Sequence, residues 1–139
     1  MKTVQKSMRI SQEMVAHIEG IARERDKDFS TVTKELLEEA IKMHRCPGIT
    51  FNDGVHGRRA RVAGTGIEVW EVIAAYKSVG ERFERLKTVF HWLSEPQLRV
   101  ALGYYRLYTD EIEQLIAQNK DWRQETVYEK FPFLAGTNA

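Results

Sequence analysis

The sequence predicts a mainly helical protein with a few short strands, built as two small domains and a tail. Apolar residues recur at helical spacing over most of the chain. Two short stretches, one near the N-terminus and one in the middle, have the pattern of strands instead. Pro47 and Gly48 interrupt the helical pattern, as such pairs do where a helix ends and a new unit begins. The expected organisation is therefore residues 1–45, 46–119 and 120–139.

The composition is ordinary for a soluble protein, without strong overall charge. The chain has 139 residues, 42% of them hydrophobic and 29% charged, with a net charge of +1. Nucleic-acid binding must therefore depend on local basic patches. A single cysteine, Cys46, excludes an internal disulfide and fits a reducing compartment. No apolar run reaches the length of a membrane span or a signal peptide, so we expect a cytoplasmic protein.

The first domain is expected to contain one strand and two helices. Within residues 3–10, side chains of one parity are mostly apolar and those of the other are polar: Val4, Met8 and Ile10 against Gln5, Ser7 and Arg9. Lys6 lies on the apolar side and is the exception. Ser11 is expected to cap the first helix and Ser30 the second.

About 45 residues cannot bury the apolar faces of one strand and two short helices in a stable core. A homodimer that pairs the two strands antiparallel would solve this problem. The run MRISQEM followed by FSTVTKELLEEAI resembles the ribbon-helix-helix family, the fold of the Arc and MetJ repressors. The resemblance covers residues 3–44 and implies an intertwined β-α-α dimer.

In that family the two-stranded ribbon enters the major groove of DNA. The resemblance therefore implies that Gln5, Ser7 and Arg9 read bases, for which their side chains are chemically suited. It also places Ser30 and Thr31 at a DNA phosphate, bound by the amides that begin the second helix. The alternative is a domain that only dimerises, with the polar face of its strand in solvent.

The second domain is expected to be a helix-turn-helix-like bundle preceded by a β-hairpin. Residues 49–51 and 60–62 can pair as short strands. Helices are expected from Val69 to near Gly80, over 81–90, after the capping box Ser-Glu-Pro-Gln at Ser94, and from Thr109.

This part of the chain resembles the family catalogued as domain of unknown function 433. The resemblance rests on ITFNDGVHG, RVAGTGIEVWEVI and HWLSEPQLRVALGYYRLYTDEIE, and spans residues 49–116. Gly66 stands where the family usually has Arg, and Ala60 where it usually has Pro. Members are regarded as predicted antitoxins encoded beside a PIN-like ribonuclease toxin. The resemblance therefore implies one component of a type II toxin–antitoxin pair.

The stretch HGRRARVAGTGIEVWEV joins three arginines and three glycines at the entry to this domain. Its glycines lack the spacing of a nucleotide-binding loop, so they are expected to serve tight backbone geometry. Arg58, Arg59 and Arg61 are expected to be uncompensated charges on a loop, suited to DNA phosphate or to an acidic toxin surface.

The tail, residues 119–139, shows no clear helical period but is rich in large apolar side chains. Such residues are costly in an irregular segment unless they dock somewhere. One interpretation is that the tail packs back on its own domain, and the other is that it binds the toxin. The expected toxin-binding residues are Trp122, Arg123, Tyr128, Lys130, Phe131 and Phe133.

No catalytic constellation, metal-ligand spacing or cofactor motif is present in the sequence, so we expect no enzyme and no cofactor. The expected function is that of an antitoxin that represses its own operon. Its partners would be operator DNA, a PIN-like ribonuclease toxin and a second copy of the chain, with a tetramer left open. The alternative is a stand-alone ribbon-helix-helix regulator whose second domain mediates oligomerisation or senses a ligand.

Overall fold

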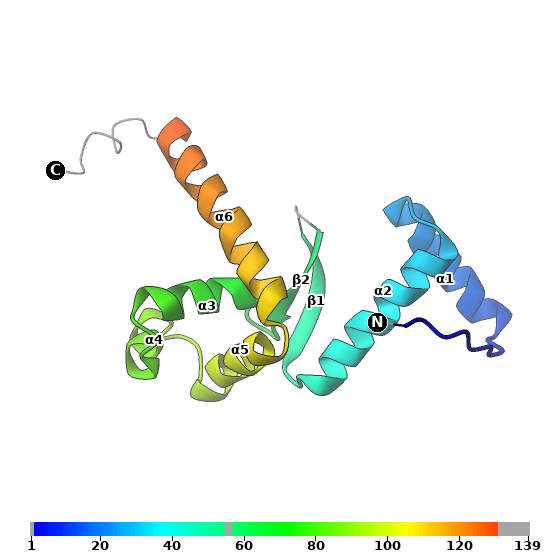
Figure 1. The fold of residues 1–139 in the computed structure, drawn as a ribbon, viewed down its shortest axis with the longest axis horizontal. Helices are drawn as coiled ribbons and strands as arrows, with labels where there is room; N and C mark the ends of the chain where they lie inside the picture. The colour runs from blue at the N-terminus through cyan, green and yellow to red at the C-terminus, as the bar shows by residue number, and fades with distance from the viewer. Residues whose placement is uncertain (1, 55–56, 131–139) are drawn as a thin grey trace. The chain divides into compact units, whose positions relative to one another are not determined.

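The computed structural model describes residues 2–54 and 57–130, with side chains described as far as Asn119. These residues form six helices and one two-stranded hairpin (Figure 1). The elements are α1 (Gln12–Arg25), α2 (Phe29–Arg45), β1 (Ile49–Gly54), β2 (Gly57–Val62), α3 (Val69–Ser78), α4 (Phe83–Val89), α5 (Glu95–Leu107) and α6 (Thr109–Lys130). A mainly helical fold with a short antiparallel hairpin was therefore predicted correctly.

The chain separates into two compact units, residues 1–42 (the first unit) and 43–139 (the second unit). The division lies inside α2, a few residues before Cys46, where the sequence predicted the boundary.

The first unit has a small core between its two helices. Ile18 and Ala22 of α1 pack with Val32 of α2, and these three are its buried apolar residues. Ser11 caps α1 as predicted, because its Oγ accepts a hydrogen bond from the Met14 amide at 3.1 Å. A core of this size leaves much apolar surface of the unit in solvent.

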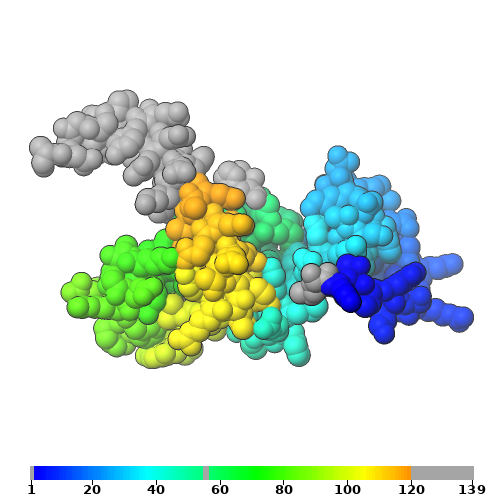
Figure 2. Space-filling view, in the orientation of Figure 1, coloured from blue at the N-terminus to red at the C-terminus, as the bar shows by residue number. Residues whose placement is uncertain are grey.

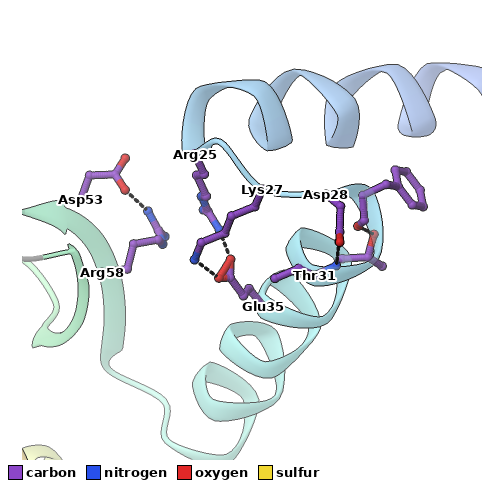
Figure 3. Close-up of polar contacts among 9 residues, drawn as sticks. Arg25, Lys27, Asp28, Thr31, Glu35, Asp53 and Arg58 are labelled. Carbon is purple, nitrogen blue, oxygen red and sulfur yellow. Dashed lines mark hydrogen bonds and ion pairs between the residues drawn. The ribbon is translucent and has the colours of Figure 1, made fainter.

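The start of α2 differs from the prediction. The helix begins at Phe29 and its cap is Asp28, whose Oδ1 accepts a hydrogen bond from the Thr31 amide at 2.7 Å (Figure 3). Ser30 therefore lies inside the first turn and is not the cap. Ser and Asp are both good N-cap residues, but Asp28 stands three residues before the free amide of Thr31 and is therefore the cap.

The connection between α1 and α2 is held by one carboxylate. Glu35 of α2 accepts hydrogen bonds from Lys27 at 2.6 Å and from Arg25 at 3.5 Å (Figure 3). The hydrogen bond from Lys27 is the main reason that the pKa of Glu35 lies below its usual value. These contacts fix the angle at which the chain enters α2.

The predicted hairpin is present and longer than expected. Strands β1 and β2 pair antiparallel from Ile49 opposite Val62 to Gly54 opposite Gly57. Ile49, Ala60 and Val62 are buried on the face that meets the helices. The alternation of burial along β2 fits a strand with one face on the core.

The helices of the second unit enclose its main core. Helix α3 packs against α4, α5 and α6, and α5 also contacts both strands. Ser94 makes the predicted capping box: its Oγ accepts from the Gln97 amide at 3.2 Å, and Gln97 accepts from the Ser94 amide at 2.8 Å. Leu98, Ala101 and Tyr104 of α5 are fully buried.

The chain turns sharply between β2 and α3. Gly64 and Gly66 adopt φ of 78° and 72°, which favours glycine. Thr65 closes the corner, because its hydroxyl donates to the Val62 carbonyl at 2.7 Å and accepts from the Ile67 amide at 3.0 Å. The glycines of this stretch therefore serve backbone geometry, as predicted.

The prediction of an irregular tail from residue 119 is wrong for the first half of that segment. Helix α6 continues to Lys130, and its first half buries Ile112 on the core beside Leu115 and Ile116. Half of the residues from 119 to 130 are good helix formers and none is Gly or Pro, which outweighs the lack of an amphipathic period.

Candidate functional site

The N-terminal segment leading to α1 is exposed and has no strand partner within one chain. Residues 2–9 are all exposed, and their side chains stand out from the helices of the first unit (Figure 2, dark blue). Gln5, Ser7 and Arg9 have no hydrogen bond or ion pair among the described residues. The predicted strand at 3–10 is not formed in the single chain, because a strand needs a second strand for its hydrogen bonds.

Apolar side chains of the same segment are exposed to an unusual degree. Val4 and Met8 are each 77% exposed, and Leu37 and Ile41 on the outer side of α2 are 54% and 56% exposed. A groove of about 590 Å³ lies between the segment and the two helices. Its lining is largely apolar: Lys6, Ser7, Met8, Ile10, Met14, Ile18, Phe29, Thr33, Leu36 and Leu37. Soluble monomers rarely expose a contiguous apolar surface of this kind.

The predicted phosphate site at the start of α2 is occupied by a carboxylate. The Thr31 amide donates to Asp28, and the Val32 amide donates to the Asp28 carbonyl at 3.1 Å. Hydrogen bonds to the Asp28 carboxylate from the Thr31 amide and the Thr31 side chain lower the pKa of Asp28, so this carboxylate is charged at neutral pH. Asp28 was not predicted as the cap, although an Asp immediately before a helical run is a standard cap signal.

The three arginines of the hairpin were predicted to be uncompensated charges on a loop, but they lie on β2, and two of them make ion pairs. Arg58 pairs with Asp53 at 3.0 Å and donates to the Phe51 carbonyl at 3.0 Å (Figure 3). Arg59 pairs with Glu68 at 3.5 Å, with both side chains mostly buried. The structure thus directs these two guanidinium groups toward their own domain.

Arg61 is the third arginine of β2. Its Nε is buried and has no hydrogen-bond partner among the described residues. Of the three arginines of β2, Arg61 is therefore the one whose guanidinium has no described carboxylate partner.

Glu68 is a residue that the sequence analysis missed. It pairs with Arg59, accepts a hydrogen bond from the Trp70 indole, and its amide donates to Glu71 at 3.3 Å at the start of α3. The spacing Glu68-x-x-Glu71 before an apolar run resembles a capping box and could have indicated this position.

Two arginines of α5, Arg99 and Arg106, differ in their surroundings. Arg99 donates to Glu95 at 2.8 Å and lies over the Phe83 ring at 4.5 Å. Arg106 is exposed and makes no ion pair in the part of the chain that is described.

The predicted toxin-binding residues fall in two groups. Trp122, Arg123, Tyr128 and Lys130 lie on α6, in the part whose side chains are not described. Phe131 and Phe133 lie outside the described residues. Their role in binding a toxin stays a prediction.

Among the described side chains, those of residues 2–54 and 57–119, no cluster of His, Cys, Asp and Glu could hold a metal ion. No helix within residues 2–54 and 57–130 is long and apolar enough to span a bilayer.

The part of the chain that is similar to a known family comprises the hairpin and helices α3 to α5. Residues 49–105 match the family described as protein of unknown function, DUF433. The match covers less than half of the chain and includes none of the first unit. No curated protein and no solved structure matches the chain.

Proposed function

We propose that the protein is a DNA-binding antitoxin. Two copies would dimerise through residues 3–44 and bind operator DNA, repressing the protein's own operon. The C-terminal half would bind and neutralise a PIN-like ribonuclease toxin. The chain would act by binding, with no catalytic step of its own.

The observation that carries the DNA-binding half is the exposed apolar surface of the first unit. Val4 and Met8 alternate with the polar residues of the N-terminal segment and are largely in solvent in one chain. Antiparallel pairing of this segment with that of a second copy would satisfy its backbone and turn both residues toward the groove. Leu37 and Ile41 would be covered in the same step. Burying one such side chain is worth about 1.5–3 kcal/mol, so the set favours a stable dimer.

The outward face of the paired segments would then carry the polar side chains. Gln5, Ser7 and Arg9 are exposed and unpaired among the described residues, so they are available for base edges. Arg suits guanine, Gln suits adenine and Ser suits either. A ribbon that served only for dimerisation would not need these residue types.

The antitoxin half of the proposal rests on the match of residues 49–105 to the DUF433 family. Relatives are regarded as antitoxins of PIN-like nucleases. The residues from Trp122 to Phe133 are rich in aromatic side chains, which make good anchors in a partner. Arg123 or Lys130 could enter the acidic metal site of such a nuclease.

DNA binding is tested by gel retardation with the region upstream of the protein's own gene. Changing Gln5, Ser7 and Arg9 together to Ala should remove sequence-specific retardation, because each bidentate base contact is worth about 1–3 kcal/mol. The variant should stay dimeric. Gln12→Ala with Arg23→Ala is the control, since it removes the same net charge from the exposed side of α1. Specific retardation by the triple variant would show that the segment is not the reader.

Toxin binding is tested separately with the product of the adjacent gene. The full chain should co-purify with it and rescue cells that express it, and a chain ending at residue 119 should do neither. If the full chain retards DNA but has no such partner, the protein is a stand-alone regulator and the antitoxin half of the proposal is wrong.

A further inference from the structure

Helix α4 and the turn after it carry exposed apolar and basic side chains together. Val89 is 42% exposed and Trp92 is 59% exposed, and both belong to the second unit. An indole in solvent is costly unless it contacts a partner, because it is the largest apolar side chain. Figure 1 places α4 at the end of the second unit away from the hairpin, so this surface is distinct from the β2 arginines.

The positions of these side chains follow from the helix. Arg85 and Val89 are four residues apart and lie on one side of α4, whereas Leu86 is fully buried. Arg82 is the N-cap residue and precedes Arg85 by three positions, which places it along the same side. The four residues Arg82, Arg85, Val89 and Trp92 are called the α4 patch below.

The Trp92 ring is held in place although it is exposed. It contacts the Phe90 ring edge-on, with centroids 5.5 Å apart, and the His91 ring with centroids 5.0 Å apart. Phe90 is the C-cap residue of α4 and is itself buried. The indole is therefore presented at the same end of the helix as Val89. A side chain fixed in this way loses little conformational freedom when a partner covers it.

The charge of the patch comes from its two arginines. Neither Arg82 nor Arg85 has an ion pair in the part of the chain that the structure describes, and both are exposed. The carboxylate of α4 itself, Glu84, lies 3.6 Å from Lys87 on another side of the helix. Lys87 also lies 3.7 Å from Glu95. Glu84, Lys87 and Glu95 are thus paired with one another, whereas the exposed Glu81 beside Arg82 makes no ion pair among the described residues. The two arginines are left for a partner.

We propose that the α4 patch docks an acidic protein surface, and that this surface belongs to the toxin. The inference rests on the proposed function, and it adds a contact outside the C-terminal segment. Trp and Arg are the residue types that dominate the energy of protein interfaces. Val89 gains nothing from a phosphate backbone but is well covered by an apolar protein surface, so the patch fits a protein better than DNA. Two arginines beside this apolar centre require carboxylates on the partner.

The test measures binding of the full chain to the product of the adjacent toxin gene. Trp92→Ala and the double variant Arg82→Glu with Arg85→Glu should each weaken binding about 10- to 100-fold. Arg106→Glu reverses another exposed, unpaired arginine of the second unit and should change binding by less than about threefold. All the changed residues are exposed, so the thermal midpoint should stay the same, and this is measured for each variant.

The outcomes separate the two proposals. If the unchanged chain does not bind the toxin, the antitoxin function is wrong and the inference falls with it. If the unchanged chain binds and the α4 variants bind equally well, only the inference is wrong. If the α4 variants keep the toxin but lose duplex DNA, the patch is a nucleic-acid surface and the inference is overturned. Loss of toxin binding with DNA retardation unchanged is the expected result.

Discussion

The carboxylate of Asp28 caps α2 by accepting a hydrogen bond from the Thr31 amide at 2.7 Å. The first turn of this helix therefore presents a negative charge where the proposed DNA complex brings a phosphate. The hydrogen bond from the Thr31 amide also lowers the pKa of Asp28, so the negative charge is present throughout the neutral range. Cap and phosphate compete for the same backbone donor.

Replacing Asp28 by Ser should strengthen DNA binding. Serine keeps a side-chain acceptor for the Thr31 amide, so the helix start is retained, while one negative charge is removed. We expect retardation of the upstream DNA to improve about three- to tenfold at low salt, with a smaller gain at high salt. Asp26→Asn is the control, because it removes the same charge from a neighbouring exposed position whose left-handed backbone Asn tolerates. Equal gains in both variants would show that net charge alone is responsible.

Dimerisation should depend on the apolar outer side of α2. Leu37 and Ile41 are 54% and 56% exposed in one chain, so their replacement by Ser costs little in the monomer. In the proposed dimer each contributes about 1.5–3 kcal/mol, and the double variant should raise the dissociation constant more than a hundredfold.

Analytical ultracentrifugation over a concentration series measures this change. Lys34→Ser alters another exposed position of α2 and should leave the dimer intact. A double variant that sediments as the same dimer as Lys34→Ser would place the dimer contact elsewhere in the chain.

Local signals account for what the sequence predicted well. Ser11 and Ser94 cap their helices as expected, because a cap depends on residues within one turn. The hairpin was also predicted, since strand pattern and turn residues are adjacent in the chain. The end of α2 near Pro47 follows from the same local chemistry.

The candidate sites were predicted less well, because they depend on residues that the fold brings together. Arg59 was expected to be free, but the corner after β2 returns the chain so that Glu68 meets it. The sequence of α4 and the turn after it does not reveal that Val89 and Trp92 are exposed, because Leu86 of the same helix is equally apolar and is buried. Only the packing of α4 on the rest of the second unit distinguishes them.

Gly48 should be the glycine of the second unit that is most sensitive to substitution. It has φ of 100°, and a Cβ built on it would lie 3.0 Å from Cγ2 of Val100 on α5. Gly48→Ala therefore combines backbone strain with a steric conflict, and we expect a loss of about 2–4 kcal/mol in the free energy of unfolding. Urea unfolding followed by circular dichroism measures it.

A matched glycine separates the two causes. Gly57 has φ of 99°, but its Cβ would meet no atom within 4 Å. Gly57→Ala should thus cost only the backbone strain, about 1–2 kcal/mol. Adding Val100→Ala to Gly48→Ala should relieve the steric part. If Gly48→Ala and Gly57→Ala cost the same, the contact with Val100 has no energetic consequence.

Tyr104 should make the second unit sensitive to alkaline pH. Its side chain is fully buried, and its hydroxyl donates to Glu111 at 2.6 Å. Burial, with the nearby Glu111 carboxylate, raises the pKa of Tyr104 far above its usual value. A raised pKa means that the folded state holds the proton more tightly than the unfolded state. The stabilisation is therefore complete below the unfolded pKa of about 10 and is lost as the pH rises above it.

Tyr104→Phe should remove this dependence. At pH 7 the variant should lose about 1–2 kcal/mol, because the hydrogen bond to Glu111 is gone. Above pH 10 the thermal midpoint of the unchanged protein should fall more steeply than that of the variant, so the two curves converge. Tyr76→Phe removes a half-buried tyrosine hydroxyl from the same unit, and its curve should run parallel to that of the unchanged protein. Other groups that titrate at high pH are common to all three proteins, so they cancel in the comparison. If the thermal midpoints of all three proteins fell in parallel above pH 10, ionisation of the Tyr104 hydroxyl would not be the cause of the loss of stability.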